Sequence, residues 1–295
     1  MKWEGNRESS NIEDRRSGGS SGGGGLIGRG SVGIGTVVLA LAASYFFGVD
    51  PMTVISVMSG GAPTTQTTGQ AAPSRASTQP PQDEMGRFVS VVLADTEDVW
   101  GGLFQQGGAR YIQPKLVLYK NRTATACGTG SAAMGPFYCP GDQRVYLDLD
   151  FFNTLKREMG AGGEFAQAYV IAHEVGHHVQ HLMGITGKVD NMRGRVSEKQ
   201  MNALSVRVEL QADCFAGVWA HHADKARQIL ENGDVESAIN AAAKIGDDAL
   251  QKRSQGYVVP DSFTHGTSAQ RVRWFNTGLQ TGSVQTCDTF NAASL

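Results

Sequence analysis

The segment His173-Glu174-Val175-Gly176-His177 places two imidazoles four residues apart, with a carboxylate next to the first. An α-helix advances about 100° per residue, so positions i and i+4 lie on one face. Both histidines can then bind one Zn²⁺ at about 2.0–2.1 Å. Glu174 extends from the same rim and can act as general base toward a water on the metal. The segment therefore predicts a helical metallohydrolase site and, among hydrolases, favours a peptidase.

The residues that precede this segment indicate a helix. Residues 164–172 combine good helix formers with an apolar stripe, and the glycines within 160–163 mark a boundary before them. Short motifs also arise by accident, but a half-buried helix of this composition is the rigid support that a metal ligand needs. We expect a helix over about 164–184.

A catalytic zinc usually takes three protein ligands and a water, so a third ligand is required. Glu209 and Asp213 are again four residues apart, in the mostly apolar segment 208–219. Because buried carboxylates need a partner, a solvated acidic face explains the pair less well than a metal site. We expect Glu209 to ligate zinc and Asp213 to accept a hydrogen bond from a ligand histidine.

His-Glu-x-x-His followed by Glu-x-x-x-Asp resembles the pattern of gluzincin metallopeptidases. Nearly all of the chain outside the linker resembles the bacterial family of neutral zinc metallopeptidases. That likeness rests on the polar start, residues 1–9, and on the segments 136–142 and 264–268. The Glu-x-x-Ala-Asp element and the late Thr-His also resemble the membrane-bound heat-shock and prenyl-protein zinc proteases.

The resemblance implies a role for each residue of the two motifs. His173, His177 and Glu209 would ligate one catalytic Zn²⁺, Glu174 would be the general base, and Asp213 would orient a ligand histidine. It also implies a zincin-like fold for the catalytic domain.

His265 is a candidate for stabilising the oxyanion that forms when water attacks a carbonyl. It lies in a loop leading into a helix that Thr267 or Ser268 caps, and it resembles the late histidine of the related membrane proteases. Arg271 is a second candidate for this role. The alternative is a loop histidine with a structural role. Four other histidines have no matching partner pattern and are expected to be structural or solvated: His178, His181, His221 and His222.

The periodicity predicts an α+β fold, mostly helical, with a small sheet. Helices are expected at about 88–103, 164–184, 195–223, 237–250 and 267–276, and strands at 115–119 and 143–149. In gluzincins an edge strand above the zinc helix pairs with the extended substrate. By position, we expect this strand to be 143–149 or the glycine-rich segment 128–135.

The composition fits an enzyme with a substantial core. With 295 residues, of which 40% are hydrophobic, the chain is long enough for one or two domains. A net charge of −2 gives no basic footprint, so no nucleic-acid partner is expected.

Residues 30–49 contain no charged side chain. Twenty helical residues span about 30 Å, enough to cross a bilayer. Basic residues precede them, and positive charge favours the cytoplasmic side. We expect a single-pass protein of the cell (inner) membrane, with a cytoplasmic amino terminus and a periplasmic catalytic domain. A buried helix or a cleaved signal peptide is the alternative.

These observations divide the chain into four parts. Residues 1–29 are expected to form a polar cytoplasmic tail and 30–49 a transmembrane anchor. Residues 50–82, rich in Ser, Thr, Gln and Pro, are expected to form a flexible linker, and 83–295 the zinc metallopeptidase domain.

The even cysteine count allows two disulfides in an oxidising compartment. Cys127 and Cys139 flank a glycine-rich loop and are expected to pair, which leaves Cys214 with Cys287. Other pairings, or four free thiols, remain alternatives. A cysteine-ligated zinc is not expected, because no Cys-x-x-Cys spacing occurs.

The expected function is a membrane-anchored, zinc-dependent endopeptidase with a polypeptide substrate. A catalytically silent, zinc-stabilised binding module is one alternative, but it would be expected to lack the glutamate at position 174. A non-peptidase zinc hydrolase is another, because zinc-activated water attacks many electrophiles. A third is a tethered interaction protein with incidental histidines, which would copurify without stoichiometric metal.

Overall fold

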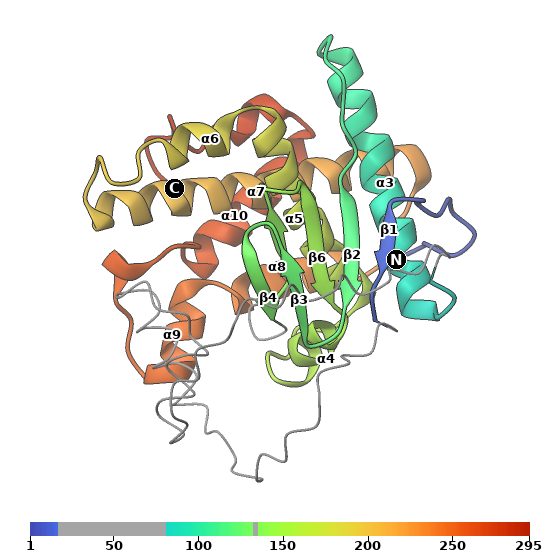
Figure 1. Ribbon diagram of the computed structural model, residues 1–295, viewed down its shortest axis with the longest axis horizontal. Helices are drawn as coiled ribbons and strands as arrows, with labels where there is room; N and C mark the ends of the chain where they lie inside the picture. The colour runs from blue at the N-terminus through green and yellow to red at the C-terminus, as the bar shows by residue number, and fades with distance from the viewer. Residues whose placement is uncertain (17–80, 132–134) are drawn as a thin grey trace, which may run out of the picture. The chain divides into compact units, whose positions relative to one another are not determined.

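Two long helices, α5 (Glu164–Leu182) and α7 (Glu198–Arg227), carry the two motifs of the sequence analysis. They belong to a computed structural model that describes residues 1–16, 81–131 and 135–295 (Figure 1). The described chain is mostly helical with two small sheets, which confirms the expected α+β class. α5 contacts both the four-stranded sheet and α7, so the first motif lies at the centre of the fold.

The four-stranded sheet has the order β1-β2-β6-β5. β2 pairs in parallel with β1 and β6, whereas β5 pairs with β6 in the antiparallel sense. β3 and β4 form a separate hairpin. The strands are β1 (Ile12–Asp14), β2 (Lys115–Tyr119), β3 (Arg122–Thr125), β4 (Gly128–Ser131), β5 (Phe137–Cys139) and β6 (Arg144–Asp148).

Side chains of the central strands alternate between two clusters, as the strand period of two requires. Leu116 and Leu118 join the main core with α5 and α7, while Val117 and Tyr119 face a smaller cluster around Tyr146. The sheet therefore packs against α5 on one side and supports its position.

The remaining helices surround this centre. They are α3 (Glu84–Gln106), α4 (Asp150–Arg157), α6 (Ile185–Asp190), α8 (Asp234–Lys244), α9 (Asp247–Gln255) and α10 (Ser268–Thr281), with 3₁₀ turns η2 (Pro260–Ser262) and η3 (Val284–Cys287). α7 and α10 both begin with a capping box, at Ser197 and Thr267. The one helix expected over 237–250 is two, α8 and α9, because the chain breaks at Gly246, where a Cβ would lie 2.5 Å from the backbone nitrogen of Ser268.

Residues 1–16 belong to the same compact unit as the described residues from 81 onward. The sequence analysis expected residues 1–29 to form a separate polar tail. β1 completes the sheet, and the indole of Trp3 donates to Glu164, the first residue of α5, at 3.0 Å. Ser9 is buried and donates to Glu97 at 2.6 Å. Polar composition alone does not distinguish a free tail from a segment whose polar groups are paired.

Other expectations for the amino-terminal region concern residues outside the described part. These are 17–29 of the expected tail, the expected anchor at 30–49, and the expected linker up to residue 80. Among the described residues, no helix combines the length and apolar character that a membrane crossing needs.

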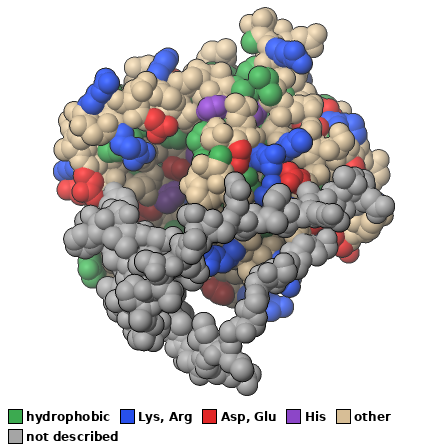
Figure 2. All heavy atoms as spheres, viewed as in Figure 1, with side chains coloured by type: hydrophobic (Ala, Val, Ile, Leu, Met, Phe, Trp, Pro, Cys, Tyr) green, Lys and Arg blue, Asp and Glu red, His purple; other side chains and the backbone are tan. Residues whose placement is uncertain are grey.

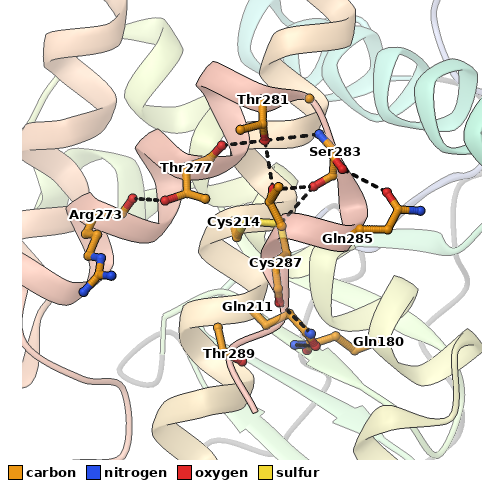
Figure 3. The surroundings of a disulfide bond; sticks show 12 residues. Gln180, Gln211, Cys214, Arg273, Thr277, Thr281, Ser283, Gln285, Cys287 and Thr289 are labelled. Atoms are coloured by element: carbon orange, nitrogen blue, oxygen red, sulfur yellow. Dashed lines mark hydrogen bonds between the residues drawn. A yellow bond between two sulfur atoms is a disulfide. The ribbon is translucent and has the colours of Figure 1, made fainter. Parts of the chain in front are cut away.

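Two disulfides, Cys127–Cys139 and Cys214–Cys287, have the expected pairing. The first joins the β3–β4 turn to the end of β5. The second joins α7 to the carboxyl-terminal segment, and Figure 3 shows its surroundings.

α10 approaches α7 so closely that both helices carry glycine at the contact. A Cβ at Gly278 would lie 1.9 Å from the carbonyl oxygen of Cys214, and one at Gly217 would lie 2.1 Å from that of Phe275. Contacts under 3.0 Å require the backbones to move apart, so this pair sets the distance between the two helices.

Gly278→Ala is expected to lower the free energy of unfolding by about 3 kcal/mol, the upper part of the range for overpacking. Gly102→Ala in α3 is the control, because no atom lies within 4 Å of its Cβ position. The control should stabilise the chain by about 0.5–1 kcal/mol through helix propensity. Urea unfolding of both variants checks this, and equal stabilities would contradict the close approach.

Candidate metal centre

Three side chains bring one ligand atom each to a common point: His173 and His177 from α5, and Glu209 from α7. The two Nε2 atoms are 3.2 Å apart, and the carboxylate oxygens of Glu209 lie 3.3 Å and 3.4 Å from them. Tetrahedral ligands bonded at about 2.05 Å would be about 3.3 Å apart. The spacing of the two Nε2 atoms and the carboxylate therefore fits a zinc ion held by these three side chains.

The protonation of the two imidazoles also suits a metal. Nδ1 of His173 lies 2.8 Å from Asp213, and Nδ1 of His177 lies 2.9 Å from the amide oxygen of Gln180. Both partners accept hydrogen bonds, so each Nδ1 carries a proton, and each ring would offer Nε2 to a metal ion, which takes the place of any proton there. Two Nε2 atoms and a carboxylate then face one another, which is an arrangement that a cation stabilises.

Asp213 is the centre of a fully buried polar network. Besides His173, it accepts hydrogen bonds from the hydroxyl of Tyr169 at 2.5 Å and from Nε and Nη2 of Arg271 at 2.8 Å and 2.9 Å. Burial opposes ionisation of Asp213, but the charge of Arg271 and the interaction with His173 lower its pKa to about 2. The carboxylate is therefore charged and fixed against the first ligand.

Arg271, expected as a candidate for oxyanion support, is 2% exposed and committed to this network. Its Nη1 also donates to the carbonyl of Ile245 at 3.3 Å. These contacts make Arg271 a positioning residue for Asp213; Arg271 also lines the cavity described below, and its oxyanion role stays a prediction.

The pKa values of the centre reflect burial and mutual charge. For His173, burial disfavours the cation, yet the charge of Asp213 and the hydrogen bond to it raise the pKa to about 10. Burial alone would raise the pKa of Glu209, but the neighbouring His177 and His173 hold it far below its usual range. Burial raises the pKa of Glu174, the expected base, which suits a group that accepts and returns a proton.

His265 reaches the same site from the loop before α10, and Asp247 at the start of α9 holds it there. Nδ1 of His265 lies 3.0 Å from Oδ1 of Asp247, while Oδ2 accepts the backbone N–H groups of Thr264, His265 and Gly266. Sequence reasoning missed Asp247. The glycine before it, which breaks the expected helix, was the signal available.

A cavity of about 860 Å³ opens over these groups. His173, His177, Glu209, Glu174 and His265 all line it. Figure 2 shows histidine side chains in a hollow of the face that it draws. The rest of the wall is largely apolar and comes from β5, α4, α6, α7 and α9, with Phe137, Phe151, Met159, Val189, Met201 and Leu250 among its residues.

The strand that borders this cavity is β5, which directly follows the expected segment 128–135; Gly135 of that segment also lines the cavity. β6 lies between β2 and β5, so both of its edges are paired, and 128–131 belongs to the β3–β4 hairpin. β5 is the last strand of the sheet, and its Phe137 and Tyr138 line the cavity. The alternation of β6 was visible in the sequence, but its partners were not.

Three other histidines have structural partners, as expected. His178 is buried, lies 2.6 Å from the carbonyl oxygen of Ile112, and accepts from the hydroxyl of Tyr138, which ties α5 to β5. Burial lowers its pKa to about 4. His221 and His222 bond carbonyl oxygens at the end of α10.

Comparisons with known proteins agree with this geometry. A family model described as "Putative neutral zinc metallopeptidase" matches residues 1–290. The "Uncharacterized protein YpfJ" of Escherichia coli K12 is 51% identical over 294 residues, covering 98% of this chain and 99% of the relative. Protein Mb2605 of Mycobacterium bovis is 40% identical over 222 residues, 72% of this chain and 74% of its own. No solved structure matches.

Asp213→Asn is expected to weaken zinc affinity about 10–100-fold, because the amide cannot hold the ligand histidine as the buried carboxylate does. Asp95→Asn is the matched control: Asp95 is buried and bonded to Arg227 and Trp219, which are not part of the centre. Competition with a chromophoric chelator measures both affinities. Equal affinities would show that Asp213 does not support the metal.

Proposed function

Because the chain belongs to the neutral zinc metallopeptidase family, we propose that it is a zinc-dependent endopeptidase with a gluzincin-type centre on a zincin-like domain. The observation that carries the proposal is the convergence of two Nε2 atoms and one carboxylate, at distances of 3.2–3.4 Å, beside a buried glutamate. His173, His177 and Glu209 would hold the zinc, which when bound supplies a Lewis acid for water and for the scissile carbonyl.

Glu174 is the general base. It is 8% exposed and follows the first ligand on α5, so it faces the cavity beside the point where the ligand atoms meet. Its carboxylate takes a proton from the attacking water and then delivers it to the leaving amine. The pKa raised by burial makes the carboxylate a stronger base for the first transfer than an exposed glutamate would be.

His265 is the donor to the oxyanion. Because Asp247 accepts the proton on Nδ1, the ring donates from Nε2 only when it is an imidazolium. Burial opposes that cation, but Asp247 and Glu209 raise the pKa of His265, with Arg271 acting against them. The pair therefore places a cationic donor at the cavity wall, where negative charge develops on the carbonyl oxygen.

The substrate is an extended polypeptide. β5 is an edge strand beside the cavity, and an edge strand offers unpaired backbone groups to a peptide that adds to the sheet. The largely apolar wall favours apolar side chains on either side of the cleaved bond. Backbone pairing combined with apolar pockets suits cleavage within unfolded or extended chains.

Glu174→Gln is expected to lower the rate of cleavage of an unfolded protein by about 10²–10⁴-fold, the usual contribution of a general base. Zinc content and thermal stability should remain those of the parent. Glu158→Gln, at an exposed position after α4, is the control. Cleavage by Glu174→Gln at the parental rate, or cleavage that survives removal of zinc by a chelator, would refute the mechanism.

Asp247→Asn is expected to lower kcat/KM about tenfold, because the His265 cation loses its anionic partner. A histidine with a raised pKa stays protonated to higher pH, so activity is lost as pH rises through that pKa. Without Asp247 the alkaline limb should move to lower pH. Asp248→Asn is the neighbouring control, since Asp248 accepts from Ser268 instead. An alkaline limb at the parental pH would remove Asp247 from the mechanism.

For the location, we propose that residues 1–16 and 81–295 lie together outside the cytoplasm. β1 pairs with β2, and Trp3 bonds to α5, so a folded chain with these contacts keeps both parts on one side of a membrane. Two disulfides favour an oxidising compartment. This differs from the cytoplasmic amino terminus expected from the sequence. A single pass at residues 30–49 would separate the two parts, so this proposal stands against the expected single-pass anchor, whose residues lie outside the described part.

Labelling from outside tests this location. Ser10→Cys and Lys252→Cys, both at exposed positions, are expected to react with a membrane-impermeant maleimide in sealed right-side-out vesicles. Labelling of Lys252→Cys with protection of Ser10→Cys until detergent is added would show that the two parts lie on opposite sides. Protection of both would place the catalytic unit inside.

A further inference from the structure

A second buried network leads away from the metal centre through neutral amides. Gln180, which is fully buried on α5, accepts a hydrogen bond from Nδ1 of His177 at 2.9 Å. Its Nε2 donates to the carbonyl of Val208 at 2.7 Å and to Oε1 of Gln211 at 3.1 Å. Gln180 therefore contacts one ligand directly and the backbone of α7 one residue before Glu209.

Gln211 continues the chain to the carboxyl-terminal segment. Its Nε2 donates to the carbonyl oxygen of Cys287 at 2.9 Å. Cys287 is bonded to Cys214, which follows Gln211 by three residues on the same helix (Figure 3). The far end of the network is thus held to α7 by a covalent bond.

The partners fix the direction of every hydrogen bond in this network. The carbonyl oxygens of Val208 and Cys287 can only accept, so the Nε2 atoms of Gln180 and Gln211 must face them. The Oε1 of Gln180 then faces His177, and the ring must carry its proton on Nδ1. Turning either amide would set two acceptors against each other in a buried site.

We propose that Gln180 and Gln211 are positioning residues for the second zinc ligand, and that the Cys214–Cys287 disulfide holds their network in place. Zinc affinity then depends on the oxidation state of this disulfide. The proposal rests on the proposed zinc site. In this arrangement His177 is positioned by the neutral amide of Gln180, whereas His173 is positioned by the charged carboxylate of Asp213.

The effect of a substitution on zinc affinity should become smaller with each step away from His177 along the network. Gln180 touches the ligand, Gln211 acts through it, and the disulfide acts through both. Opening the disulfide leaves other ties between the carboxyl-terminal segment and α7, because the buried Thr289 still donates to the carbonyl of Arg207 at 2.7 Å. The disulfide should therefore tune the affinity and not abolish binding.

Chelator competition on the full chain measures zinc affinity for each step. Gln180→Leu is expected to weaken affinity about 10–100-fold, the usual effect of losing a partner of a ligand histidine. Gln211→Leu should have a smaller effect, and the double variant Cys214→Ser/Cys287→Ser a several-fold one. The matched control, Cys127→Ser/Cys139→Ser, removes a disulfide that has no bond to this network and should keep the parental affinity.

Gln180→Glu separates positioning from general support of the fold. Its carboxylate still accepts from His177 but cannot donate to Val208 or Gln211. If Gln180 positions the ligand, this variant loses stability in a thermal melt yet binds zinc more tightly than Gln180→Leu does. Equal weakening by Glu and Leu would make the role purely structural and overturn the proposal.

A trialkylphosphine tests the disulfide without substitution. The phosphine attacks one sulfur, water supplies the oxygen of the phosphine oxide, and the two sulfurs leave as thiols. Zinc transfer to the chelator should accelerate in the parent and not in Cys214→Ser/Cys287→Ser. Unchanged transfer in the parent, with both disulfides shown to be reduced, would overturn the redox link. A parent that binds no zinc would refute the proposed function itself.

Discussion

Three side chains that can ligate one metal ion and that meet at one point are the constraint on which the rest of this structure depends. The Nε2 atoms of two imidazoles lie 3.2 Å apart, and each lies 3.3–3.4 Å from one oxygen of a carboxylate, where α5 meets α7. Such a cluster needs a metal ion or a proton between its members, and the fold must hold them together. Packing of α5 on α7 does so. Gly176, between the two histidines, permits this contact, because a Cβ there would lie 3.0 Å from the carbonyl oxygen of Ala212.

The groups that support the ligands come from parts of the chain distant in sequence. α10 supplies Arg271 for Asp213, and the carboxyl-terminal segment supplies the carbonyl of Cys287 that anchors the amides. The break between α8 and α9 supplies Asp247 for His265. Residues 1–16 brace the start of α5 through Trp3. Segments that contain none of the three candidate ligands therefore hold α5 at its start, along its length and at His173 and His177.

The sequence predicted the parts of the site that follow from helical spacing. The site contains two pairs of residues spaced by four, His173 with His177 and Glu209 with Asp213. This spacing puts each pair on one face of its helix, however the helices pack. Gln180 and Asp247 had no such signal, since their partners come from other elements. The edge position of β5 depends on sheet order, and the seating of residues 1–16 depends on paired charges and one indole. Neither follows from local composition.

The way in which the chain binds zinc is the most direct test of the proposed metal centre. X-ray absorption at the zinc edge of the purified, zinc-loaded chain measures the identity and distance of the ligand atoms. We expect one zinc per chain, with two imidazole nitrogens at about 2.0–2.1 Å, oxygen ligands at about 2.0–2.2 Å and no sulfur. A zinc bound through sulfur, a shell without two imidazoles, or no stoichiometric zinc would contradict the central claim.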